Sequence, residues 1–305
     1  ITGLANEAVT LTDTSLAASV LNTLDGNTTG AVNAATVTTL TGTAAAVNTA
    51  YASGGITGLA NEAVTLTDTS LAASVLNTLN GNTTGAVNAA TVTTLTGTAA
   101  VLATTYGASG ITGLGNEAIT ITGSDVSSVA NLKTINDATS GTITLNSETI
   151  AGNLSGSAAD LVAAFAGITG LTGTITVSAG SVAATDLTAI DTAASTAVVA
   201  TAVTTITGTA AEVEDAIDNQ STIDTAADVA VTITGSSAAA ADLVAIDAAT
   251  TGGINASSVS TLTGTAADAN TVLASSGITG PTNPAVTISD TSLAASVLNT
   301  LDGNT

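Results

Sequence analysis

The sequence has no histidine, cysteine, methionine or tryptophan, and Lys133 is its one basic residue against 23 acidic ones, which gives a net charge of −22. Catalysis near neutral pH, phosphate binding and soft-metal ligation usually depend on His, Cys, Lys or Arg side chains. We therefore expect no enzyme, no catalytic residue and no cofactor. Nucleic acid is also excluded as a partner, because this chain would repel a polyanion along its length.

Aromatic residues and long apolar runs are scarce as well. The aromatics are Tyr51, Tyr106 and Phe165, so the 45% of residues that are apolar are nearly all Ala, Val, Leu and Ile. That share is too high for a disordered acidic tail and predicts a core of thin, closely packed layers. No run reaches the roughly 18 apolar residues that indicate a membrane span. The absence of cysteine means that no disulfide holds the fold.

Internal repeats organise what is present. The phrase ITGLANEAVTLTDTSLAASVLNT begins at Ile1 and again at Ile56, and a shorter version begins at Ile111. These starts define a long period, and a finer signal, TLTD or TLTG with its variants, recurs at about half of it, roughly every 27 residues. The sequence predicts about eleven turns in one continuous domain, 1–305, whose least regular zone is 124–180.

The two ends of the sequence lie inside repeats. The last residues, 291–305, are identical to residues 14–28, and the first residue opens a repeated phrase. Neither end shows the polar cap that a terminal repeat needs. We expect both ends to be uncapped, and the chain to be part of a longer one or to join copies of itself head to tail.

One turn can be interpreted from its pattern. Residues 8–12 alternate apolar with β-branched polar residues, which is typical of a short strand. Residues 14–24 then place Leu16, Val20 and Leu24 at helical spacing, and Asp25-Gly26 ends the helix. A Gly-rich return, such as GAVNAA, predicts a bend and a second extended piece. The fold class is therefore expected to be a parallel β-solenoid of α/β type, with one short strand and one short helix per turn of about 27 residues.

Pairs of threonines follow the predicted strands and would stack into two parallel files on one face of the sheet. The pairs are Thr10 and Thr12, Thr39 and Thr41, Thr65 and Thr67, Thr94 and Thr96, and Thr120 and Thr122. Such files resemble the ice-binding faces of β-solenoid antifreeze proteins, which implies regularly spaced ordered water. The plainer interpretation is structural, because threonine suits strands and like side chains pack in register.

Acidic residues near turns and helix starts are weak candidates for Ca²⁺ ligands, namely Asp25, Glu212 and Asp215. A specific Ca²⁺ site needs six to eight converging oxygens and usually several carboxylates. Most turns here offer one isolated carboxylate. Helix capping is the simpler role, since Glu212 follows Thr209 at the spacing of a capping box.

Tyr51 and Tyr106 occupy matching positions one long period apart. Stacked aromatics suit a carbohydrate-binding platform. The alternative is edge packing with the hydroxyls in water.

The phrases ITGLANEAVTLTDTSLAASVLNTLDGNTTG, VTTLTGTAAAVNTAYASGGITG and SAAADLVAIDAATTG resemble the repeats of very large, acidic, Ala/Thr/Gly-rich cell-surface proteins of marine bacteria, cyanobacteria in particular. This resemblance covers nearly the whole chain. It implies secretion and a structural, adhesive or motility-linked surface role, with no active site. The Gly-Gly-x-Gly-x-Asp calcium repeats that such proteins often carry are missing, so the resemblance does not imply calcium-dependent folding.

These observations favour a non-catalytic structural repeat protein of an extracellular fibre, filament or cell-surface layer. The alternative is a binding module that uses the threonine face for ice or for surface glycans. The expected partners are further copies of the chain, head to tail, or further repeats of a longer chain. Spread over about eleven turns, the charge of −22 amounts to roughly two per turn and disfavours lateral clumping.

Overall fold

The computed structural model describes residues 5–123, 128–146, 153–218 and 222–305. Residue contacts divide the chain into two compact units, Ile1–Ile150 and Ala151–Thr305. Parts of the zone that the sequence predicts to be irregular, 124–127 and 147–152, lie outside the described residues.

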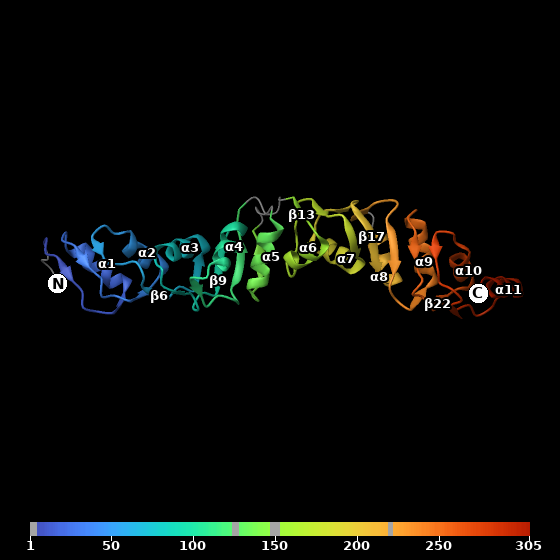
Figure 1. Ribbon diagram of the computed structural model, residues 1–305, viewed down its shortest axis with the longest axis horizontal. Coiled ribbons are helices and arrows are strands. Elements are labelled where there is room, and N and C mark those ends of the chain that lie inside the picture. Colours follow the sequence, from blue (N-terminus) through green and yellow to red (C-terminus); the bar gives the residue numbers. More distant parts are fainter. Residues whose placement is uncertain (1–4, 124–127, 147–152, 219–221) are drawn as a thin grey trace. The chain divides into compact units, whose positions relative to one another are not determined.

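Short helices recur along both units, each packed on the next one within its unit (Figure 1). Helices α1, α2 and α3 begin at Ala18, Ala44 and Ala73, so a shorter step is followed by a longer one. Both steps lie close to the roughly 27 residues expected from the sequence. The helices of the first unit are α1 (Ala18–Asn27), α2 (Ala44–Ala52), α3 (Ala73–Asn82), α4 (Ala99–Gly107) and α5 (Val129–Ala138). Those of the second unit are α6 (Ala158–Phe165), α7 (Ala184–Ala193), α8 (Ala210–Asp218), α9 (Ala240–Ala249), α10 (Ala266–Ala274) and α11 (Ala295–Asn304).

The strands are short, and they pair in parallel throughout the described residues. In the first unit the sheets have the orders β1-β3-β5, β10-β8-β6-β4-β2 and β12-β11-β9-β7. Their strands are β1 (Val9–Thr10), β2 (Ser15–Ala17), β3 (Val32–Asn33), β4 (Thr39–Gly42), β5 (Ile56–Thr57), β6 (Ala63–Leu66), β7 (Ser70–Ala72), β8 (Val87–Asn88), β9 (Thr94–Gly97), β10 (Ile111–Thr112), β11 (Ala118–Ile121) and β12 (Ile143–Leu145).

The second unit has the same organisation. Its sheets have the orders β13-β14-β16-β18, β15-β17-β19-β21-β23 and β20-β22-β24. Their strands are β13 (Leu154–Gly156), β14 (Ile175–Val177), β15 (Gly180–Ala183), β16 (Val198–Ala200), β17 (Val203–Gly208), β18 (Ile223–Thr225), β19 (Ala230–Ile233), β20 (Ser237–Ala239), β21 (Ile254–Asn255), β22 (Thr261–Gly264), β23 (Ile278–Thr279) and β24 (Ala285–Ile288).

Two kinds of strand–helix repeat alternate in the first unit. We call A-type the repeats in which SLA precedes the helix ASVLNTL, with helices α1, α3 and α11, and we include α9, preceded by SAA. B-type repeats carry the strand TLTG and the helices α2, α4 and α10. B-type helices are capped by the hydroxyl of a threonine, as at Thr43, which accepts from Ala46 N at 3.2 Å. A-type helices begin at alanine caps without a side-chain hydrogen bond, as at Ala17.

Each repeat contains more strands than the one per turn that the sequence predicts. The B-type repeat of α4 has β8 and β9, and the A-type repeat of α3 has β5, β6 and β7. Within the first unit the paired residues of neighbouring strands, such as Leu16 with Leu40 and Leu40 with Val64, lie closer together in the sequence than the starts of successive helices. Strand pairing therefore steps along the chain by fewer residues than the helices do, so successive strands of one sheet come from earlier and earlier parts of their repeats. Each sheet ends after three to five strands.

The core lies between the strands and the helices. Leu40 and Leu95 of the B-type strands and Leu21, Leu76 and Leu102 of the helices are all fully buried. Their strand neighbours on either side point outward, which is the alternation predicted from the sequence. The structure thus has an α/β repeat fold built on small aliphatic side chains.

Candidate functional site

The threonine pairs do not form the two continuous files expected from the sequence. Aligning TLTG with TLTD would place Thr41 beside Thr67, but the strands are displaced from that alignment, and Thr41 pairs with Thr65. On the other side of β4, Thr41 pairs with Ala17, and beyond β6 the partner of Thr65 is Asn88. The displacement amounts to two residues along the strand. Because side chains alternate between the two faces of a strand, a shift of two residues keeps the same side chains pointing outward.

The other candidate threonines show the same interruption. Thr96 pairs with Thr120, but Thr39 pairs with Ala63 and Thr94 with Ala118. Thr10 pairs with Asn33 in another sheet. Thr12, Thr67 and Thr122 lie outside the strands. The structure therefore brings these residues together as isolated threonine pairs, and not as an extended regular array.

Tyr51 and Tyr106 belong to a polar contact that was not predicted from the sequence. The Tyr51 hydroxyl donates to Glu62 Oε2 at 2.7 Å, and the Tyr106 hydroxyl donates to Glu117 Oε2 at 3.0 Å. Both glutamates are fully buried, and each also accepts from a backbone N–H just before it in the chain, that of Ala60 or Gly115. Each pair ties the end of a B-type helix to a loop between two strands of the next repeat, the loop between β5 and β6 or between β10 and β11.

This environment raises the pKa of both tyrosines. Burial is the main cause that raises the pKa of Tyr51 above its usual value; a hydrogen bond with Thr83 opposes it and Glu62 adds to it. For Tyr106, burial and then the charge of Glu117 raise the pKa. The hydroxyls are used inside the repeat junction, which does not favour a carbohydrate platform.

A Thr-Thr-Gly or Thr-Ser-Gly segment stabilises the same junction through hydrogen bonds. The buried Thr83 hydroxyl donates to Glu62 O at 2.7 Å and accepts from Gly85 N at 3.0 Å. Thr139, buried likewise, bonds in the same way to Glu117 O and Gly141 N. A Cβ on Gly85 would overlap the Glu62 carbonyl, so only glycine fits without movement. The repeated phrase NTTG is the sequence signal for this contact.

The third copy of the B-to-A junction lacks both partners of the tyrosine–glutamate pair. By alignment with the repeats of Tyr51 and Glu62, Leu273 stands at the tyrosine position and Pro284 at the glutamate position. Both are replaced together within one chain. This junction therefore has neither the glutamate nor the phenol that would donate to it.

The aspartate of TLTD or TISD caps the helix of the preceding repeat. Asp68 Oδ2 accepts from Ala44 N, the first residue of α2, at 2.7 Å, and Asp290 Oδ2 accepts from Ala266 N at 2.8 Å. A carboxylate at a helix N-terminus accepts from a free N–H and interacts favourably with the positive end of the helix dipole. These residues therefore join one repeat to the next.

The three candidate Ca²⁺ ligands make structural contacts and do not come together as one site. Asp25 Oδ2 accepts from Ser53 Oγ of the adjacent repeat at 2.6 Å. Glu212 Oε2 accepts from Thr209 N at 2.8 Å, and the pKa of this carboxyl lies below its usual value because of that bond. Asp215 lies on the same helix, α8, with other contacts. Among the described residues, no group of three acidic side chains is placed to hold a metal ion.

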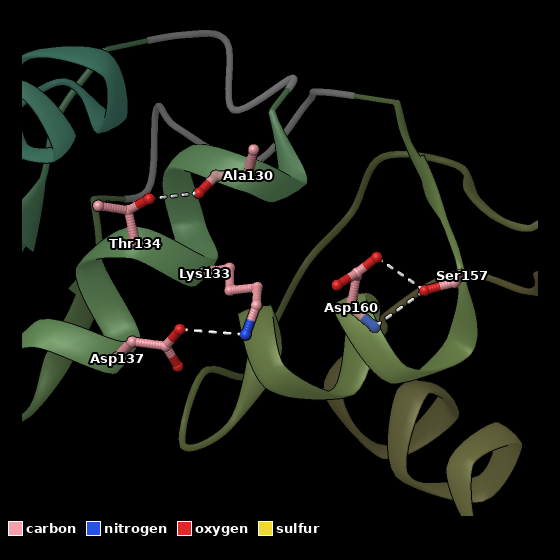
Figure 2. A network of polar contacts seen from close by, with 6 residues as sticks. All are labelled: Ala130, Lys133, Thr134, Asp137, Ser157 and Asp160. Atoms are coloured by element: carbon pink, nitrogen blue, oxygen red, sulfur yellow. Dashed lines mark hydrogen bonds and ion pairs between the residues drawn. The ribbon is translucent and has the colours of Figure 1, made fainter.

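The one basic side chain is also used locally. In α5, Lys133 Nζ donates to Asp137 Oδ2 at 3.0 Å, one helical turn on, while Thr134 donates to Ala130 O at 2.9 Å (Figure 2). In the second unit, Ser157 Oγ caps α6 by accepting from Asp160 N at 3.2 Å and donating to Asp160 Oδ2 at 2.8 Å (Figure 2). Both contacts stabilise helices.

The polar groups described above converge on repeat junctions and helix ends, where they satisfy backbone groups. None of the described helices is both long enough and apolar enough to cross a membrane. No protein-family model, no curated protein and no solved structure matches this chain.

Proposed function

We propose that the chain is a structural repeat segment, a parallel β-solenoid of α/β type that serves a mechanical and spatial role without catalysis. The observation that carries the proposal is the use of polar side chains. Glu62, Glu117, Asp68, Asp25 and Asp290 all bind groups of their own or an adjacent repeat. A chain that uses its buried and part-buried carboxylates in this way is built for stacking.

Stacking of like repeats supports a solenoid. Parallel strand pairing with a nearly constant step along the chain recurs from β1 to β12, and each helix of the first unit packs on the next. Each repeat buries its aliphatic side chains partly against its neighbours, so a single repeat would have little core of its own.

We infer a location outside the cell, in a fibre, filament or surface layer, from two other observations. The repeats resemble those of giant bacterial cell-surface proteins, and the net charge of −22 would keep long objects apart in solution. In such an assembly the chain stacks on further repeats of the same kind.

Electron microscopy of the native material, with antibodies against this chain, tests the proposal. We expect labelled, long and uniform fibres or a surface layer on intact cells. Label confined to isolated short particles inside broken cells would contradict it. Purified chain assayed for hydrolysis of ester, peptide and glycoside substrates should show no turnover.

The alternative, binding of ice or surface glycans by threonines, has narrower support. It rests on the outward pairs Thr41–Thr65 and Thr96–Thr120. Thermal hysteresis of the wild type and of a variant with valine at these four positions distinguishes the two functions. Ice shaping by the wild type that the variant loses would make ice binding the function.

A further inference from the structure

The last repeat has a sequence that is buried elsewhere in the chain but is exposed here. Residues 291–305 are identical to 14–28 and differ from 69–83 only at the position of Asn80. Leu21 of α1 and Leu76 of α3 are fully buried, whereas the equivalent Leu298 of α11 is 43% exposed. The difference therefore comes from what covers the helix, and not from its sequence.

The backbone before the helix shows the same contrast. The segment SLA forms strand β2 before α1 and strand β7 before α3. In both places a B-type TLTG strand pairs with it, as Leu16 with Leu40 and Leu71 with Leu95. Residues 292–294 have the same sequence but are not in a strand, and no described strand pairs with them. Because none of the described strands pairs with it, this segment is a ready edge for one more parallel strand.

A groove of about 450 Å³ is lined by residues of strand β24 and of helix α11, the helix that follows residues 292–294. Val286, Ile288, Leu298 and Leu301 give it apolar walls, and Asn299 and Asp302 also line it. The buried copies show what those two polar residues bind.

In the buried copy α1, the next B-type helix and the residue that follows it supply the partners. Asn22 Nδ2 donates to Ala46 O at 2.8 Å, and Asp25 Oδ2 accepts from Ser53 Oγ at 2.6 Å. In α3, Asn77 Nδ2 donates likewise to Val101 O at 3.1 Å. Asn299 and Asp302 stand at the positions of Asn22 and Asp25.

We propose that this face is a docking surface for a B-type repeat: a TLTG strand that adds to residues 292–294, followed by an Ala-rich helix that covers Leu298. The proposal depends on the stacking of repeats proposed above, but not on the location of the protein.

The opposite face favours the same partner. Asp13 of the first A-type repeat stands at the position from which Asp68 and Asp290 cap a preceding B-type helix. Direct docking of two copies would place an A-type repeat against another A-type repeat. Both faces therefore fit a B-type repeat, and two copies do not fit each other directly.

The test extends the full chain after Thr305 by the sequence of residues 29–58, which is B-type. Matched controls carry the same residues in scrambled order, or the A-type sequence of residues 1–28. Hydrogen exchange at residues 292–294, and thiol labelling of Leu298→Cys in this cysteine-free chain, report coverage of the face. We expect the B-type extension to slow both by about tenfold or more, with little change in either control.

Two results would overturn the proposal. One is equal protection by the A-type extension, or none by the B-type extension, in chains that keep the circular dichroism of the parent. The other is concentration-dependent assembly of the unextended chain in light scattering. Since neither readout concerns native fibres, fibres seen on cells together with an unprotected face would contradict this proposal alone.

Discussion

The hydroxyl of Tyr51 donates a hydrogen bond of 2.7 Å to Oε2 of Glu62, a carboxyl group with no exposed surface. Tyr51→Phe keeps the ring but leaves that oxygen with one donor fewer. Since a buried polar group that loses a partner costs about 1–3 kcal/mol, we expect the free energy of unfolding to fall by that amount in urea denaturation.

The chain offers two controls for this variant. Tyr106→Phe removes the equivalent bond to Glu117 and should cost a similar amount. Thr49→Ala removes an exposed bond to a carbonyl of the same helix and should change stability by about 0.5 kcal/mol or less. Equal losses in Tyr51→Phe and Thr49→Ala would show that the buried pair has no special role.

Stability should depend on alkaline pH through the two tyrosines. Burial raises the pKa of both phenols above the value of about 10 that they have when unfolded. Above that pH the unfolded chain loses phenolic protons that the folded chain keeps. The stabilisation is therefore complete below about pH 10 and is lost progressively as the pH rises above it.

Urea denaturation at about pH 8 and at several values above pH 10 measures this effect. The wild type should lose stability more steeply than the double variant Tyr51→Phe/Tyr106→Phe. Parallel pH profiles of the two proteins would contradict the role assigned to burial of the phenols.

Asp68 should stabilise a helix that belongs to the preceding repeat. Asp68→Ala removes the acceptor of Ala44 N and leaves the first N–H of α2 without it. We expect a loss of about 0.5–2 kcal/mol and faster hydrogen exchange in α2. Asp13→Ala is the matched control, because none of the described residues places a helix before Asp13; an equal loss there would contradict capping across repeats.

Gly85 should tolerate no side chain, because a Cβ would overlap the backbone of Glu62. Gly85→Ala is expected to destabilise the chain by about 1–3 kcal/mol, the usual cost of overpacking. A Cβ on Gly81, near the end of α3, would meet no atom within 4 Å. Gly81→Ala should therefore be neutral or slightly stabilising, and a comparable loss at both glycines would argue against the close approach at Gly85.

Much of the fold follows from the sequence. The recurrence of the helices, as from Ala18 to Ala44 to Ala73, is set by repeated phrases with clear helical spacing. Strand register is different. Thr41 beside Thr65 and Thr41 beside Thr67 both keep the apolar residues inward, so the hydrophobic pattern does not distinguish them. The observed register is the one in which Asp68 lies close enough to cap α2.

The buried glutamates are the part of the candidate site that was not predicted from the sequence. A charged residue in a Gly-rich loop is ordinarily exposed, so Glu62 gives no local sign of burial. The signal lies in the joint replacement of Tyr51 and Glu62 by Leu273 and Pro284 in another copy. Only a comparison of repeats at two positions at once reveals it.

Disulfide formation in this cysteine-free chain tests the stacking of repeats most directly. Adjacent parallel strands place the Cα atoms of paired residues about 5 Å apart, within the range of a disulfide. The Cα atom two residues further along the neighbouring strand lies about 8 Å away, outside that range. We expect Thr41→Cys/Thr65→Cys to oxidise fully to an intramolecular disulfide, and Thr41→Cys/Thr67→Cys to stay reduced under the same conditions. Preferred closure of the second pair, or of neither, would contradict this strand register and the stacking that depends on it.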